Sequence, residues 1–124
     1  MSLQFEDFAR WGVPMHTCAR RILEQLYGLK IEPFVLEGGN YSVDSLDFNP
    51  NAAAEMDVIL ELNHLFGDDF FPVALMYVSG IYVSVAGVTV CSRQDEFWKV
   101  GDAFSESLDR LICAEGDIER FDRL

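Results

Sequence analysis

The sequence predicts an α+β domain in which helices pack on a mostly antiparallel sheet of about five or six strands. Three observations support this fold class. Hydrophobic spacing alternates along the chain between helical and strand-like periods, glycines separate the strand-like segments, and half of the 124 residues are hydrophobic, enough for a buried core. The expected order is helices, strands, a helix, strands and a final helix, and residues 1–124 are expected to form a single domain.

Two helices are expected first. Apolar residues at roughly helical spacing predict one helix over residues 2–11, with Gly12 as its stop. Pro14 suits the first turn of a second helix. The apolar stripe of this second helix continues to Leu26, and Gly28 is its expected C-terminal cap.

A hairpin and a third helix are expected next. Alternating apolar residues over residues 31–48, interrupted by Gly38-Gly39-Asn40, predict two strands joined by a glycine turn. In the stretch DFNPNAAAEM that follows, Asn49 can cap a helix, and Pro50 suits its first position because proline's missing N–H costs nothing there. Helical spacing of apolar residues then continues this third helix to Gly67.

The second half of the chain predicts a meander and a last helix. The segments VALMYV, IYVSVA and VTVCS are rich in β-branched residues, and Ser79-Gly80 and Ala86-Gly87 are the expected turns between them. The last helix is expected to begin near Asp102, which can act as an N-cap, and to end at Gly116. Its expected buried stripe consists of Phe104, Leu108, Leu111 and Ile112.

Composition favours a soluble, cytoplasmic protein. The longest apolar stretches are too short and too interrupted for a membrane helix, and no charged-then-apolar leader opens the chain. The three cysteines, Cys18, Cys91 and Cys113, are scattered and lack C-x-x-C spacing, which is typical of buried reduced thiols rather than of disulfides.

The distribution of charge carries the clearest functional signal. Nine basic residues face 21 acidic ones, and no Lys or Arg lies between Lys30 and Arg93. That interval holds nine carboxylates: Glu32, Glu37, Asp44, Asp47, Glu55, Asp57, Glu61, Asp68 and Asp69. Nucleic acid is a poor partner for such a surface, because phosphates are held by Lys and Arg. Two interpretations stay open: a solubilising surface, or steering toward a basic partner, which can raise association rates by roughly 10 to 10³-fold.

Motifs for catalysis and cofactor binding are missing from the sequence. Neither G-x-S-x-G, G-x-G-x-x-G nor G-x-x-x-x-G-K occurs. His16 and Cys18 are expected on different faces of a helix, which favours a capping or surface role for His16 over a metal site. Glu61 and His64 converge as in di-iron bundles, but such sites need a second copy of the motif and further glutamates. We therefore expect no catalytic residue, no cofactor and no metal.

The third helix carries like charges that stability alone would not select. Asp57 and Glu61 are four residues apart, and Asp68 and Asp69 follow the helix end, where the helix dipole favours positive groups. Each like-charged pair costs about 0.2 to 0.5 kcal/mol. Because costs this small are commonly tolerated, a solvated face and a binding role both stay open.

Several short phrases along the chain are shared with a known family. They are Leu46-Asp47-Phe48-Asn49-Pro50 before a helix, Gly67 with Phe71-Pro72-Val73 after it, and Trp98, Gly101, Ser105-Glu106-Ser107-Leu108, Leu111-Ile112 and Gly116 at the close. In this order they resemble the SUKH superfamily, and within it the third branch of bacterial immunity proteins. The segment Tyr27-Gly28-Leu29-Lys30-Ile31 is similar as well. The likeness covers roughly residues 8 to 118, and Ser107 stands where the closing phrase usually has alanine.

The resemblance implies a protein that binds and neutralises a cognate secreted toxin, frequently a nuclease, inside the producing cell. A nuclease holds phosphate with basic residues, so an acidic mimic of nucleic acid is a sensible inhibitor of it. Charge and resemblance together predict a non-enzymatic protein-binding domain with no nucleic-acid or membrane partner. The expected contacts are Asp44, Asp47, Asp57, Glu61, Asp68 and Asp69, with Tyr41 or Trp98 as aromatic candidates. For Trp98, a position in the core is the favoured alternative.

Two other functions stay open. One is an adaptor or regulatory domain, because other SUKH-like proteins bind secretion or cell-wall machinery. The other is a small-ligand binding domain with a pocket between helix and sheet. The sequence predicts neither the identity of the toxin nor the oligomeric state.

Overall fold

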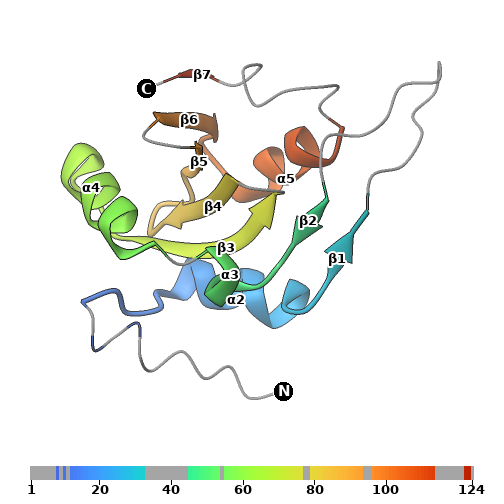
Figure 1. The fold of residues 1–124 in the computed structure, drawn as a ribbon, viewed down its shortest axis with the longest axis horizontal. Coiled ribbons are helices and arrows are strands. Elements are labelled where there is room, and N and C mark those ends of the chain that lie inside the picture. The colour runs from blue at the N-terminus through green and yellow to red at the C-terminus, as the bar shows by residue number, and fades with distance from the viewer. Residues whose placement is uncertain are drawn as a thin grey trace.

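The fold is a single antiparallel sheet with helices packed against it. The computed structural model describes residues 8, 10, 12–32, 45–53, 55–76, 79–93, 96–113 and 122–123. Within them a seven-stranded sheet runs in the order β1 to β7, and every neighbouring pair is antiparallel (Figure 1). The predicted α+β class is confirmed.

The long strands form the centre of the sheet, and the two-residue strands lie toward its edges. In chain order the described elements are α2 (Thr17–Leu26), β1 (Lys30–Ile31), β2 (Leu46–Asp47), α3 (Pro50–Ala53), α4 (Met56–Phe66), β3 (Phe70–Met76), β4 (Ser79–Ser84), β5 (Thr89–Arg93), β6 (Glu96–Gly101), α5 (Phe104–Cys113) and β7 (Asp122–Arg123).

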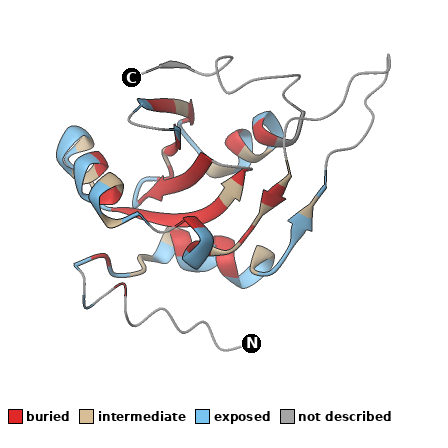
Figure 2. Ribbon diagram, viewed as in Figure 1, coloured by how far each residue is buried: buried red, intermediate tan, exposed pale blue. Residues whose placement is uncertain are grey.

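Strand β3 is covered on both faces. Successive residues of a strand point to opposite faces of the sheet. The Phe71 ring lies 5.1 Å from the Phe8 ring and 6.5 Å from the His16 ring just before α2, whereas the Phe70 ring lies 5.2 Å from the Phe66 ring of α4. Helices α2 and α4 therefore pack on opposite sides of β3, which explains why the run FFPVALM is almost entirely buried (Figure 2).

Helix α2 begins as a histidine-capped helix. The backbone N–H of Ala19 donates to His16 Nδ1 at 3.1 Å, and His16 Nε2 lies 2.9 Å from the carbonyl oxygen of Val83 in β4. Because a carbonyl can only accept, Nε2 carries the proton and donates it to Val83. The capping role predicted for His16 is confirmed, and Gly28 follows the helix with a φ of +85°.

The third predicted helix begins as expected but is divided in two. Pro50 is the first residue of α3, and Asn49 Oδ1 accepts the backbone N–H of Asn51 at 3.1 Å. Helix α3 ends at Ala53, whose carbonyl oxygen accepts the buried hydroxyl of Tyr82 at 2.9 Å. Glu55 is extended, with φ −125° and ψ 102°, and α4 starts as a separate helix after it.

Of the two predicted meander turns, one is confirmed and the other is wrong. Ala86-Gly87 forms a turn, with a φ of +96° at Gly87 and a 2.9 Å bond from its N–H to the Ser84 carbonyl. Ser79 and Gly80 instead belong to β4, where they pair with Met76 and Leu75. A Cβ on Gly80 would lie 2.5 Å from the Tyr82 hydroxyl oxygen, so this glycine provides space for the phenol. The chain between β3 and β4 lies outside the described residues.

Several other expectations meet the structure only in part. The hairpin predicted over residues 31–48 is confirmed at its base, where Lys30 pairs with Asp47 and Ile31 with Leu46. Its Gly38-Gly39-Asn40 turn lies outside the described residues, as does Gly116. In the helix predicted over residues 2–11, only Phe8 and Arg10 are described, and both are helical. Strand β6 has no counterpart among the predicted elements.

The described helices are short. The longest of them, α4, has 11 residues, about half of the roughly 20 that a bilayer-spanning helix needs.

Candidate protein-binding surface

Neutral hydrogen bonds lie on both sides of helix α4 in the chain. Three residues before α4, at the end of α3, the Ala53 carbonyl accepts the Tyr82 hydroxyl. After the last turn of α4, Gly67 adopts a left-handed conformation, with a φ of +64°. There the backbone N–H of Phe70 donates to Asn63 Oδ1 at 2.7 Å. These contacts, together with the buried Ile59 and Leu62, determine which side of α4 faces the sheet.

The opposite side of α4 carries charged and apolar side chains into solvent. Five residues at helical spacing are exposed there, and we call them the α4 face: Asp57, Leu60, Glu61, His64 and Leu65. Figure 2 shows this outer side of the helix as exposed. The carboxylates of Asp57 and Glu61 form no ion pair or hydrogen bond with any residue that the structure describes. The fold therefore makes no use of these two charges.

Asp68 and Asp69, which follow α4, have different surroundings. The Asp68 carboxylate accepts the backbone N–H of Asp69 at 2.8 Å and that of Ala86 at 3.4 Å. Asp68 is half-buried and ties the end of α4 to the turn between β4 and β5, so its charge has a structural use that the sequence did not indicate. Asp69 is exposed, and its backbone carbonyl accepts the N–H of Val85 at 3.1 Å.

Asp47, another predicted contact residue, does not join the α4 face. Asp47 is half-buried in β2 and pairs with Leu75 of β3. Leu75 is five residues from Phe70, where β3 leaves the α4 end, a separation of roughly 17 Å along a strand. Asp44 and Tyr41 lie outside the described residues.

Trp98 is a core residue rather than an exposed contact. Its side chain is 5% exposed and lies on β6, between Cys91 of β5 and Arg123 of β7 in the sheet register. The prediction of Trp98 as a contact is therefore wrong, and the favoured alternative is confirmed. The strand that carries it, β6, was not among the predicted elements.

Three exposed apolar residues near the acidic side chains were missed by the sequence reasoning. Leu60 is 50% exposed, Leu65 58% and Val85, in the turn after β4, 50%. The signal for the two leucines was present in the sequence, because both lie off the buried stripe formed by Met56, Ile59, Leu62 and Phe66. The position of Val85 depends on the meander turn and has no such signal.

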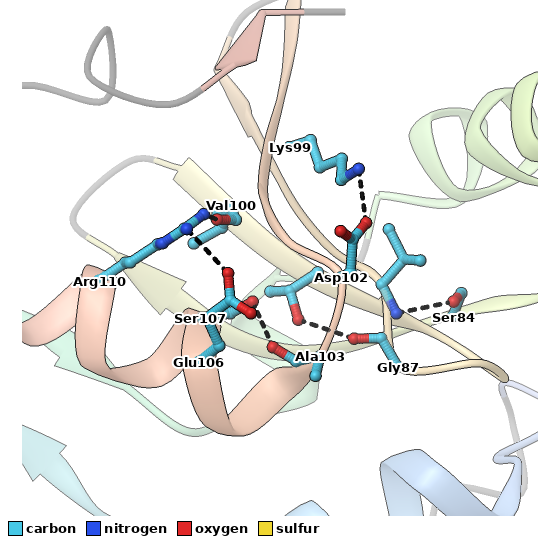
Figure 3. A network of polar contacts seen from close by, with 11 residues as sticks. Ser84, Gly87, Lys99, Val100, Asp102, Ala103, Glu106, Ser107 and Arg110 are labelled. Atoms are coloured by element: carbon cyan, nitrogen blue, oxygen red, sulfur yellow. Dashed lines mark hydrogen bonds and ion pairs between the residues drawn. The ribbon is translucent and has the colours of Figure 1, made fainter.

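The polar residues around α5 form a second cluster, and its members satisfy one another (Figure 3). The Asp102 carboxylate pairs with Lys99 at 2.5 Å, and Glu106 pairs with Arg110 at 2.8 Å. Arg110 also donates to the Val100 carbonyl at 2.6 Å, and the Ser107 hydroxyl donates to the Ala103 carbonyl at 2.7 Å. These contacts attach α5 to β6. The carboxylate of Asp102, the predicted N-cap, is used in the ion pair with Lys99. Asp102 lies one position before Ala103, whose carbonyl accepts the Ser107 N–H at the start of α5.

The described thiols are held in their protonated form. Burial raises the pKa of the Cys91 thiol to about 12. Burial also raises the pKa of Cys18, with Arg21 acting in the opposite direction. Because the thiolate is the reactive form of cysteine, neither environment activates a nucleophile. The Cys113 side chain lies outside the described residues.

Potential metal ligands and buried polar groups are the other features of the described residues that bear on ligand binding. No group of three or more His, Cys, Asp or Glu side chains is arranged there to hold a metal ion. Every buried side-chain nitrogen or oxygen in the same part has a hydrogen-bond partner. Among these residues the α4 face combines exposed carboxylates that form no hydrogen bond or ion pair with exposed apolar side chains.

Comparisons of the chain with protein-family models, with curated proteins and with solved structures found no match.

Proposed function

We propose that this protein is a non-enzymatic immunity protein that binds and neutralises a cognate secreted toxin inside the producing cell. The observation that carries the proposal is the α4 face, where Asp57 and Glu61 are exposed and unpaired among the described residues. Like charges at this spacing cost about 0.2 to 0.5 kcal/mol. A partner with complementary charge turns this cost into attraction.

Long-range electrostatics support a basic partner. The chain has a net charge of −12, and no basic residue lies between Lys30 and Arg93. Such a field attracts positively charged proteins and can raise association rates by roughly 10 to 10³-fold, with a strong dependence on salt. It repels nucleic acid, whose backbone is also negative. A toxin that is a nuclease fits this field, because its active site must hold phosphate with Lys and Arg.

The proposal predicts that a toxin domain is encoded beside this gene, and it is tested by co-expression with that domain. We expect cells that express this domain alone to stop growing, and cells that also express this protein without an export signal to grow normally. A catalytically inactive toxin domain should form a stable complex with the protein in size-exclusion chromatography. A neighbouring gene that encodes no toxin, or a toxin that still kills cells containing this protein, would show that the proposal is wrong.

A further inference from the structure

The arrangement of side chains around α4 indicates more than a charged surface. At about 100° per residue, Leu60 and Leu65 lie about 140° apart around the helix axis, with Asp57 and Glu61 between them. The exposed side of α4 is thus an acidic row with an apolar side chain on each border. At the C-terminal end of the helix, Val85 adds a third exposed apolar residue, held there by its N–H bond to the Asp69 carbonyl.

Exposed apolar residues are concentrated in this region. Of the four large hydrophobic side chains that are exposed in the described part of the chain, Leu60, Leu65 and Val85 belong to it, and only Leu29 lies elsewhere. Exposed apolar side chains beside charged ones are typical of protein interfaces, where a few desolvated anchors supply most of the binding energy.

We propose that the α4 face and Val85 form a docking surface for a protein whose own surface presents a row of Lys or Arg flanked by apolar side chains. The inference rests on the proposed function for the existence of a protein partner, and it adds where that partner binds and through which chemistry. The basic row would face Asp57 and Glu61, and the apolar side chains would cover Leu60 and Leu65.

Charge complementarity selects this occupant over the alternatives. Anionic lipid headgroups and nucleic-acid phosphates would be repelled by the acidic row. A second copy of the chain docked by the same face about a two-fold axis would place Asp57 and Glu61 against their own counterparts, and like charges opposed in an interface cost several kcal/mol.

The apolar anchors are tested with the double variant Leu60→Ser and Leu65→Ser and with the inactive toxin domain as the probe. Both leucines are half exposed, so the variant should fold, which circular dichroism and thermal melting would check. We expect Kd to rise at least about 10-fold, mainly through faster dissociation, because desolvated apolar anchors act on the bound state. The matched control is Leu29→Ser, which should change Kd less than about two-fold.

The acidic row is tested with the double variant Asp57→Lys and Glu61→Lys. We expect the association rate at low salt to fall at least about 10-fold, and the difference from the unmodified protein to shrink as salt is raised. The matched control is Glu24→Lys with Asp109→Lys, which makes the same change in net charge on exposed positions of α2 and α5. Equal losses in the two variants would show that only net charge matters and would overturn the proposed location.

The outcomes separate this inference from the proposed function. If the unmodified protein does not bind the toxin domain, the proposed function fails. If it binds, and both α4 variants bind equally well, the function stands and the docking surface is wrong. Analytical ultracentrifugation of the protein alone tests whether a second copy of the chain occupies this face. A dimer that the leucine variant converts to a monomer would assign the face to that second copy and overturn the proposal.

Discussion

Helices α4 and α5 are alike in length and acidity, but they use their charges differently. On α5 and the loop before it, Glu106 pairs with Arg110 and Asp102 pairs with Lys99. On α4, Asp57 and Glu61 have no such partner among the described residues. The chain on either side of α4 is instead held by neutral groups: the Tyr82 hydroxyl binds the Ala53 carbonyl at the end of α3, and the Asn63 amide oxygen binds the Phe70 N–H at the start of β3.

The difference teaches that acidity has two separate uses in this chain. Around α5, four charges form two ion pairs, so the position of the helix and these charges depend on one another. Around α4, the position of the helix is set without using Asp57 or Glu61. Charge changes on α4 should therefore alter binding more than folding, and changes in the two ion pairs should alter folding.

Alkaline pH should break the hydrogen bond from Tyr82 to Ala53 and give the largest effect on stability. Burial raises the pKa of Tyr82 to about 12, with a hydrogen bond to Ser92 opposing the rise and Glu55 adding to it. Above pH 10 the unfolded chain loses its phenol proton while the folded protein keeps it. The stabilisation is therefore complete below pH 10, and about 2 to 3 kcal/mol is lost as pH rises through 12.

The measurement is the free energy of unfolding in urea between pH 9 and pH 12. It should be made on a Cys91→Ala background, because burial raises the pKa of that thiol to about 12 and its titration would add to the same trend. Tyr82→Phe in the same background should show a flatter profile. Equal profiles with and without the Tyr82 hydroxyl would exclude the phenol as the source.

Crowding the contact between α5 and β6 should give the next largest effect. A Cβ on Gly101 would lie 2.6 Å from the buried Ser107 hydroxyl oxygen, so Gly101→Ala should reduce the free energy of unfolding by about 1 to 3 kcal/mol. Ser107→Ala removes the opposing oxygen and should recover part of that loss in the double variant. Strictly additive effects in this double-mutant cycle would contradict the close contact.

Removing the guanidinium of Arg110 should have a smaller effect. Arg110→Met keeps much of the side-chain length but loses the bond to the Val100 carbonyl and the pair with Glu106. Since the ion pair is half exposed, we expect a loss of about 1 kcal/mol in unfolding experiments, most of it from the carbonyl. In the Arg110→Met background, Glu106→Gln should leave the free energy of unfolding nearly unchanged, because the ion pair is already lost. A further loss of stability would show that Glu106 has a role independent of Arg110.

Neutralising the row on α4 should have the smallest effect on stability and the opposite sign. Asp57→Asn with Glu61→Gln removes one like-charged pair and should stabilise the protein by about 0.2 to 0.5 kcal/mol at low salt. Thermal melts at two salt concentrations would detect this as a difference that disappears at high salt. A clear loss of stability would instead show that the two carboxylates take part in a contact that stabilises the fold. Helices α4 and α5 would then use their charges in the same way.

Local chemistry made part of the fold predictable from sequence. Asn49 and Pro50 start a helix, and Gly87 forms a turn, through groups within two or three residues of each position. Features that depend on distant contacts were not predictable. The bond from the Tyr82 hydroxyl to the Ala53 carbonyl joins residues 29 positions apart, and no local pattern indicates it. The position of Gly80 in β4, rather than in a turn, depends on its pairing with Leu75.

The candidate site shows the same limit. Asp57 and Glu61 were correctly expected on an acidic helix, because helical spacing separates exposed from buried positions. Asp68 has a structural role because its carboxylate accepts the N–H of Ala86, 18 residues away. The sequence shows only its charge, so the prediction grouped Asp68 with the exposed acidic residues. Trp98 and Asp47 lie in paired strands, away from the exposed acidic residues of α4. The sequence predicts that strands occur in these regions better than it predicts how they pair.

The inward attachment of α4 has a consequence for how the protein can change. The bonds made by Tyr82 and Asn63, and the buried side chains of the helix, involve none of the five exposed positions. These five positions can therefore vary together while the domain keeps its fold. A library randomised at those positions should contain mostly folded members. The same separation would let a lineage acquire a new partner by substitutions on one helix while the rest of the chain stays constant.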